Sequence, residues 1–143
     1  MKIWFKDYTL DEIRFLEKKN MLEHLGIEMT EIGNDYLCGR MPVDERTVQS
    51  MNTLHGGASV ALAESIGSIA TFLTLDPEKY YCVGMEINAN HLRRVRTGYV
   101  YATARPLHRG RRTHVWSIDI IDENKQLVCV SRITMAIVEH WEK

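Results

Sequence analysis

Two hydrophobic periods divide the chain, and each predicts a different kind of element. Across Leu54–Leu75, apolar and small residues follow one another almost without interruption, and Glu64 is the only carboxylate. The run begins at His55-Gly-Gly57 and ends before Asp76-Pro77, which are typical helix boundaries, so it predicts one long buried helix. Beyond Tyr80 the apolar residues recur at every second position, which is the period of a strand with one buried face.

The remaining segments are shorter. Thr9 with Glu12 three residues later is a capping-box pattern for a helix from Tyr8 to Lys19, which Asn20 then breaks. A further helical turn is expected at Met21 to Leu25. Strands are expected over Ile27 to Ile32, Tyr36 to Val43 (joined at Gly33-Asn-Asp35, with Pro42 at the end of the second), Tyr81 to Asn90, Tyr99 to Arg105, Thr113 to Ile121 and Leu127 to Val138.

One long helix followed by long antiparallel strands predicts an α+β fold whose antiparallel sheet wraps around the helix. At 143 residues, the chain is expected to form a single domain, residues 1–143, with its own core. The long apolar run also has the length of a membrane span. Glu64 inside it, and the lack of a second apolar segment, favour a core helix instead.

Composition limits the classes of binding partner and the cellular location that are expected. The net charge of −1 gives no reason to expect nucleic acid or an anionic membrane surface. The N-terminus has no continuous apolar segment and no cleavage site, so export is not expected. Cys38, Cys82 and Cys129 are far apart in strand-like runs, which predicts reduced, buried thiols in a cytoplasmic protein.

Glu64 is the first candidate for chemistry. Its neighbours three and four residues away are apolar or small, apart from Ser68, so its own helix does not provide it with a solvated face. A carboxylate is costly to bury unless it is paired or used. Ser68, one turn later, is placed to orient the carboxylate or a water beside it.

Gly56 offers a second candidate group at the start of the same helix. Its unpaired backbone N–H, with His55 beside it, suits an oxyanion or a carbonyl group. Gly56 and Glu64 are eight residues apart, which is about 12 Å along a helix. One helix therefore cannot bring both to the same carbonyl, whereas two antiparallel helices around a two-fold axis can, which predicts a homodimer with shared sites.

Seven arginines fall between residues 93 and 112 of an otherwise balanced chain. Charged side chains on an exposed strand edge deter it from pairing with other sheets. So many arginines close together could also bind phosphate groups, to which arginine donates bidentate hydrogen bonds. Aromatic residues between them are few and no helix is placed to read a groove, so a nucleotide-bearing small molecule fits better than nucleic acid. These arginines are Arg93, Arg94, Arg96, Arg105, Arg109, Arg111 and Arg112.

Three other kinds of site are disfavoured. Gly57-Ala-Ser-Val-Ala61 lacks the last glycine of a nucleophile elbow, and the chain is too short for that hydrolase fold. Cys82 with His91 is a conceivable nucleophile and base, but no activating context accompanies them. The six histidines show no metal-ligand spacing.

A set of motifs extends over nearly the whole chain: Met41-Pro-Val-Asp44, Arg46-Thr47, Gln49, Leu54-His-Gly-Gly-Ala-Ser59, Leu62-Ala-Glu-Ser-Ile-Gly-Ser68, Val83-Gly-Met-Glu-Ile-Asn-Ala-Asn-His91, Pro106-Leu-His-Arg-Gly110 and Trp116-Ser-Ile-Asp-Ile120. With these motifs the chain resembles the hotdog-fold acyl-CoA thioesterases, in particular the subgroup acting on 1,4-dihydroxy-2-naphthoyl-CoA and its paralogue that proofreads aryl carrier proteins. One departure is Ser50-Met-Asn52, where the family pattern has Pro-Phe-Gly.

The resemblance implies roles for these residues. Glu64 would be the catalytic carboxylate, either attacking the thioester or activating water. Gln49 and the Gly56 N–H would polarise the carbonyl with His55 nearby, and Ser68 would assist Glu64. The implied substrate contacts are Val83 and Gly84 lining the channel, His91 beside the acyl or pantetheine group, and Arg93, Arg109, Gly110 and Arg111 at the CoA phosphates.

The expected function is hydrolysis of acyl-CoA thioesters, with an aromatic acyl group. No metal or redox cofactor is expected. The resemblance implies a homodimer or a dimer of dimers with no nucleic-acid or membrane partner. Two alternatives are a proofreading thioesterase acting on an acyl or aryl carrier protein, and a non-catalytic module that binds acyl-CoA.

Overall fold

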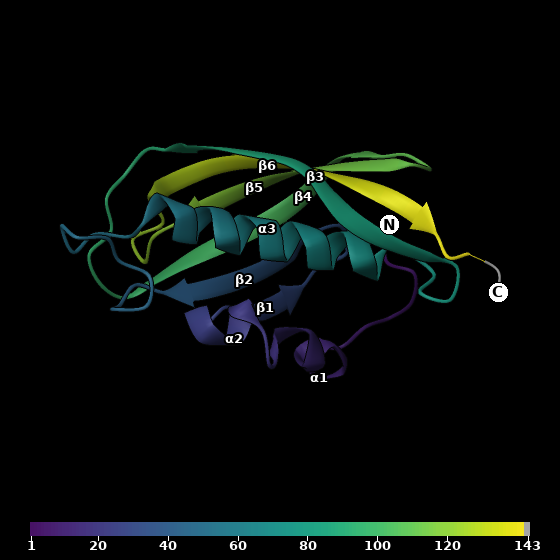
Figure 1. The fold of residues 1–143 in the computed structure, drawn as a ribbon, viewed down its shortest axis with the longest axis horizontal. Helices are drawn as coiled ribbons and strands as arrows, with labels where there is room; N and C mark the ends of the chain where they lie inside the picture. Colours follow the sequence, from purple (N-terminus) through teal and green to yellow (C-terminus); the bar gives the residue numbers. More distant parts are fainter. Residues whose placement is uncertain (142–143) are drawn as a thin grey trace.

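An antiparallel sheet wraps around one long helix (Figure 1). The computed structural model describes residues 1–141. Six strands are hydrogen-bonded in the order β1-β2-β4-β5-β6-β3. The elements in chain order are α1 (Leu10–Ile13), the 3₁₀ turn η1 (Arg14–Glu17), α2 (Met21–Leu25), β1 (Glu28–Ile32), β2 (Leu37–Pro42), α3 (Gly56–Leu73), β3 (Tyr80–His91), β4 (Tyr99–Arg109), β5 (Thr113–Ile121) and β6 (Leu127–Glu139).

The α+β hotdog architecture predicted from the sequence is confirmed. Leu62, Ile66 and Leu73 of α3 are fully buried against the sheet. A Cβ on Gly67 would lie 2.6 Å from Cγ2 of Ile133, so the helix and β6 can approach this closely only because residue 67 is glycine. α3 has the length and composition of a membrane span, yet it is the core helix that the sheet surrounds.

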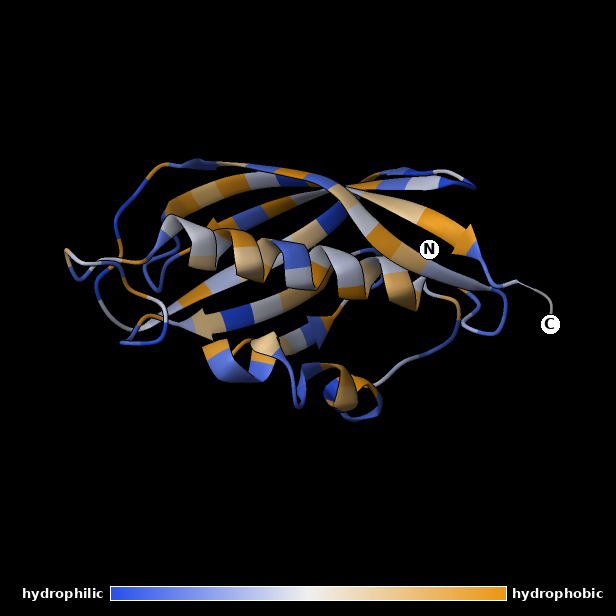
Figure 2. Cartoon of the chain, in the orientation of Figure 1, coloured by the Kyte–Doolittle hydropathy of each residue, from blue (hydrophilic) through white to orange (hydrophobic). Residues whose placement is uncertain are grey.

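Figure 2 shows one hydrophilic band near the middle of an otherwise pale or hydrophobic α3. Glu64 is the only charged residue of this helix. Hydrophilic residues also occur in α2, at intervals along the strands and in the loops (Figure 2). The helix therefore combines a core face with one charged position.

The helix predicted from Tyr8 to Lys19 is shorter than expected, because α1 ends at Ile13 and continues only as the 3₁₀ turn η1 to Glu17, while the local capping signals are present. Thr9 caps α1 in a complete capping box with Glu12. Asn20 does more than end a helix, because its Oδ1 accepts hydrogen bonds from the backbone N–H groups of Leu22 and Glu23 and so caps α2. The pairing of β1 with β2 across the predicted turn is antiparallel.

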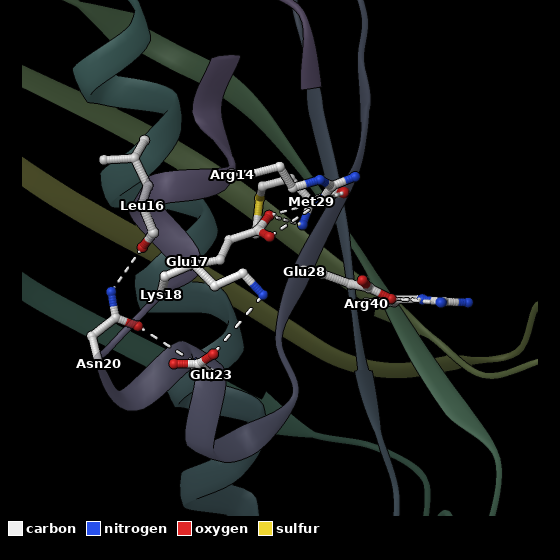
Figure 3. Close-up of polar contacts among 9 residues, drawn as sticks. All are labelled: Arg14, Leu16, Glu17, Lys18, Asn20, Glu23, Glu28, Met29 and Arg40. Carbon is white, nitrogen blue, oxygen red and sulfur yellow. Dashed lines mark hydrogen bonds and ion pairs between the residues drawn. The ribbon is translucent and has the colours of Figure 1, made fainter. Parts of the chain in front are cut away.

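A buried carboxylate attaches this N-terminal layer to the sheet (Figure 3). Glu17 is 4% exposed and accepts two hydrogen bonds from Nη1 of Arg14, both at 3.1 Å. Its Oε1 also accepts the backbone N–H of Met29 in β1 at 2.6 Å. Arg14 closes the arrangement by donating to the carbonyl of Met29 at 2.8 Å. No pattern in the sequence predicted this role of Glu17.

β3 departs from the regular alternation expected between residues 81 and 90. Its register with β6 shifts between Gly84 and Glu86, so Met85 is an extra residue in a bulge. Before the bulge Gly84 faces α3, and after it Ile87 packs against the core. The prediction that Met85 and Ile87 share one face is therefore wrong, and Met85 is 64% exposed.

Candidate active site

Glu64 lies in the middle of α3 with its carboxylate against β3. A Cβ on Gly84 would lie 2.5 Å from Oε1 of Glu64, so only glycine leaves room for this carboxylate. Burial raises the pKa of Glu64, and no charge or hydrogen bond offsets that effect. The carboxylate is thus half-buried and adjacent to the backbone of an edge strand, and no cationic side chain within residues 1–141 pairs with it.

Ser68 lies one turn further along α3 but bonds elsewhere. Its hydroxyl donates to Sδ of Met135 at 3.9 Å, a weak contact, rather than to Glu64. The backbone carbonyl of Ser68 accepts from the thiol of Cys82 at 3.8 Å. Ser68 therefore stands near the carboxylate without orienting it in this structure, and its proposed assistance stays a prediction.

The start of α3 presents hydrogen-bond donors. His55 is the N-cap, and its Nδ1 accepts the backbone N–H of Gly57 at 2.8 Å. The proton of a neutral ring is therefore on Nε2, which leaves an N–H donor on the other side of the ring. Gly56 occupies the first helical position, where the backbone N–H has no partner within the helix.

Gln49 and His91 complete this end of the helix. The Gln49 amide donates to Thr53 Oγ1 at 2.6 Å and accepts the backbone N–H of Met51 at 2.6 Å. An amide nitrogen carries two protons, so one donor of Gln49 stays available. A Cβ on Gly56 would lie 2.9 Å from Nε2 of His91, which places the imidazole directly beside the helix start.

These groups line a groove of about 390 Å³, here named the basic groove. Nothing in the sequence analysis placed Ser59 and Arg94 in it. Within it, Arg93 makes one long hydrogen bond to Oε1 of Gln126 at 3.4 Å, which leaves most of its guanidinium free. The basic groove is lined by Gln49, Leu54, Gly56, Ser59, His91, Leu92, Arg93, Arg94 and Val128.

The arginines predicted to form one patch lie at two ends of the sheet. His91, just before Arg93, is in register with Ile120 of β5 through β6, whereas Arg109 pairs with His114 at the other end of β5. The six residue-to-residue steps from His114 to Ile120 span about 20 Å. Gly110 and Arg111 follow Arg109 in the β4–β5 turn. Within one protomer, β5 thus separates the two groups, so a single protomer does not gather these arginines into one patch, and their binding of the CoA phosphates stays a prediction.

Gly84 and Val83 are neighbours in β3, where successive residues face opposite sides of the strand. Gly84 faces Glu64, whereas Val83 lies on the opposite side of the strand and is 46% exposed.

Cys82 and His91 lie toward opposite ends of β3, and burial raises the pKa of the Cys82 thiol to about 11. A Cys–His nucleophile is therefore excluded for this pair. Residues 1–141 contain no group of three or more His, Cys, Asp or Glu side chains that could hold a metal ion.

Comparisons with known proteins agree with this geometry. Residues 51–129 match the family model of the thioesterase superfamily. The chain is 48% identical over 136 residues to the 1,4-dihydroxy-2-naphthoyl-CoA hydrolase of Escherichia coli K12, covering 95% of this chain and 99% of that protein. The chain belongs to the thioesterase superfamily. It is a thioester hydrolase, as the resemblance implied.

Other thioesterase-superfamily members are similar over the same length. The proofreading thioesterase EntH of Cronobacter turicensis is 44% identical, over 95% of this chain and 98% of its own. A thioesterase of Pseudomonas aeruginosa, solved with one glutamine changed to alanine, superposes with a TM-score of 0.95 at 44% identity, covering 97% of this chain and all of its own.

A thioesterase-superfamily relative from Staphylococcus aureus adds a detail. Its structure with one glutamate changed to alanine superposes with a TM-score of 0.82 at 37% identity, covering 85% of this chain and 100% of its own. Its structure with one glutamine changed to alanine superposes with a TM-score of 0.79 at 38% identity, covering 82% of this chain and 97% of its own. The two altered positions are 15 residues apart in that protein, as Gln49 and Glu64 are here.

Proposed function

We propose that this thioesterase hydrolyses aromatic acyl-CoA thioesters, of the 1,4-dihydroxy-2-naphthoyl-CoA or benzoyl-CoA type, at sites shared by two protomers. The observation that carries the proposal is the division of the site along α3. The donors gather at Gly56 and the free carboxylate lies at Glu64, eight residues later on one continuous helix, about 12 Å away. Each protomer therefore contains both halves of a site, but too far apart to act together. The donor half of one protomer is completed only by the carboxylate half of a second protomer.

The surface left open supports such a dimer. β3 is an edge strand that pairs with β6 alone, so its other edge presents unpaired backbone groups. Val60 and Ala61, about one turn before Glu64 on α3, are half-buried like Glu64 itself, so this part of the helix stays partly accessible beside β3. A two-fold axis beside β3 would cover both features and bring Gly56 of one protomer toward Glu64 of the partner subunit.

The chemistry follows from the half-sites. The Gly56 N–H, the His55 Nε2–H and the free Gln49 N–H polarise the thioester carbonyl and stabilise the oxyanion that forms on it. Glu64 of the partner subunit either attacks the carbonyl carbon itself or takes a proton from a water molecule that attacks it. The carbon–sulfur bond of the resulting tetrahedral adduct breaks and CoA leaves as the thiolate. The first route leaves an anhydride with Glu64, which water then hydrolyses, and the second route gives the free acid directly. Loss of one such donor typically costs about 3–4 kcal/mol in barrier height.

A complementation experiment tests the shared site. Glu64→Ala and His55→Ala chains are each expected to be inactive alone, with the dimer intact. After subunit exchange, half of the dimers are mixed, and each mixed dimer has one site free of both substitutions. About a quarter of the sites should then be active. No recovery in a verified mixed dimer, or substantial activity of Glu64→Ala alone, would contradict the proposed mechanism.

The acyl group is tested with a panel of aromatic, short-chain and long-chain acyl-CoA thioesters, following release of free thiol. The proposal expects the highest kcat/KM for aromatic groups, in keeping with the 48% identical naphthoyl-CoA hydrolase. A preference for long-chain fatty acyl groups would overturn the aromatic assignment while leaving the shared mechanism in place.

A carrier-protein substrate is the second candidate. The exposed Arg109, Arg111 and Arg112 in the β4–β5 turn could receive an acidic partner, and a 44% identical relative is a proofreading thioesterase. Turnover of one acyl group attached either to CoA or to a carrier protein separates the two functions. A higher kcat/KM with the carrier would favour proofreading.

A further inference from the structure

Two grooves flank the first turn of α3. The basic groove lies on the β3 side and includes Gly56. On the other side, a groove of about 190 Å³ lies between α2 and the start of α3 and includes His55 and Gly57. This second groove, here named the α2 groove, is lined in its apolar part by Met21, Leu25, Val48 and Ala58.

Two polar side chains around the α2 groove already have hydrogen-bond partners. Arg46 is held by Asp44, with its Nη2 2.6 Å from Oδ2 and its Nε 3.0 Å from Oδ1. The hydroxyl of Thr47 donates to the carbonyl of Pro42 at 2.7 Å. What the groove offers a ligand is therefore mainly apolar surface and the His55 ring. An apolar cavity of about 150 Å³ is sufficient for benzene, so the α2 groove has room for one ring.

His55 connects the α2 groove to the carbonyl site. Its Nδ1 is occupied by the Gly57 N–H, so its donor is Nε2, and the ring lines the α2 groove. Gly56, the neighbouring donor, lines the basic groove. A carbonyl held between these two donors has one substituent directed to each groove. The polyanionic CoA part suits the groove that carries Arg93 and Arg94, and an apolar acyl part suits the other.

We propose that the α2 groove receives the acyl group, and that Met21 is a residue that determines which acyl groups fit. This inference rests on the proposed function and adds a location for the acyl part. Met21 is 60% exposed on the rim of the groove. Its unbranched side chain can adjust to ligands of different shape, and a rim position allows it to be changed without disturbing the core.

The test is the acyl preference of Met21 variants. With acetyl-, butyryl-, benzoyl- and naphthoyl-CoA, Met21→Trp should lower kcat/KM for the two aromatic esters at least about tenfold and leave acetyl-CoA within about twofold, because the larger side chain fills the groove. Met21→Ala should shift the preference toward naphthoyl-CoA. Product inhibition by free CoA should stay unchanged in both, since CoA occupies the basic groove.

Phe15→Ala is the matched control, because Phe15 is 64% exposed on η1 in the same N-terminal layer but does not line the groove. Equal effects of Met21→Trp on all four esters, or none, would overturn this inference while leaving hydrolysis itself intact. Failure of the unaltered protein to release CoA from any ester would instead overturn the proposed function, and this inference with it.

Discussion

The Glu64 carboxylate lies against the backbone of Gly84, so closely that a Cβ there would be 2.5 Å from Oε1. The carboxylate is at the end of a flexible side chain, so a single methyl group on residue 84 would displace it. The position of the proposed catalytic group is therefore determined by the absence of a side chain on the neighbouring strand.

Gly84→Ala is expected to lower kcat by about 10–100-fold, because a displacement of roughly 1 Å at a reacting group has effects of this size. The protein should stay folded, since residue 84 is at the exposed edge strand. Steady-state kinetics with thermal denaturation measures both quantities. Glu86→Ala, on the outer face of the same strand, is the control. Unchanged kcat in Gly84→Ala would show that the carboxylate need not occupy this position.

The raised pKa of Glu64 predicts that this carboxylate supports activity but lowers the stability of the fold. Burial raises its pKa, so folding disfavours the charged form. The free energy of unfolding therefore falls as the pH rises from the usual glutamate pKa through the raised one, and it is fully regained below the usual value. Glu64→Gln should therefore be inactive yet unfold at a higher temperature than the parent protein at pH 8, with the difference shrinking toward pH 4.

The same shift predicts the pH dependence of catalysis. The charged form of Glu64 is the reactive one, so kcat should fall on the acid side with an apparent pKa above the ordinary value of about 4.3 for glutamate. A pH–rate profile measures this midpoint. A midpoint at or below that value would show that burial does not control the reactive carboxylate.

Periodicity was sufficient to predict the fold. The 54–75 run and the turn before Tyr36 depend on local sequence, and the long helix and the strand pair they predict are present. The capping box at Thr9 correctly predicts where α1 begins, but not that it ends at Ile13. The charged position of α3 was also visible in the sequence, because a lone carboxylate among apolar and small residues needs no tertiary information to be noticed.

What periodicity could not predict depends on contacts between distant segments. The bulge at Met85 changes which residues of β3 face the helix, and an extra residue is apparent only against the partner strand β6. Arg93 and Arg109 are close in sequence, yet hairpin topology places them at opposite ends of the sheet. The α2 groove likewise depends on how Glu17 attaches the N-terminal layer to β1.

That attachment leads to a prediction about stability. Glu17→Ala should lower the free energy of unfolding by about 3 kcal/mol, because it removes the partner of Arg14 and leaves the buried Met29 N–H without an acceptor. Chemical denaturation measures the change. Asp7→Ala, which breaks an exposed pair with Lys2, should change it by less than about 1 kcal/mol. Equal effects of the two substitutions would contradict the structural role of Glu17.

Arg93 is expected to bind the nucleotide part of the substrate, because it lines the same groove as Gly56 and its guanidinium is mostly free. One charge-assisted hydrogen bond to phosphate contributes about 1.5 kcal/mol, so Arg93→Ala should raise KM for acyl-CoA roughly tenfold. The contact is the same in the ground and transition states, so kcat should not change.

A shortened substrate distinguishes this role from a general structural effect. With an acyl pantetheine thioester, which has no nucleotide, Arg93→Ala and the parent protein should have the same KM, and high salt should narrow their difference on acyl-CoA. Arg132→Ala, an exposed arginine on β6, is the control. An equal increase in KM for the shortened thioester would mean that Arg93 shapes the groove instead of binding phosphate, and would transfer the phosphate role to the arginines of the β4–β5 turn.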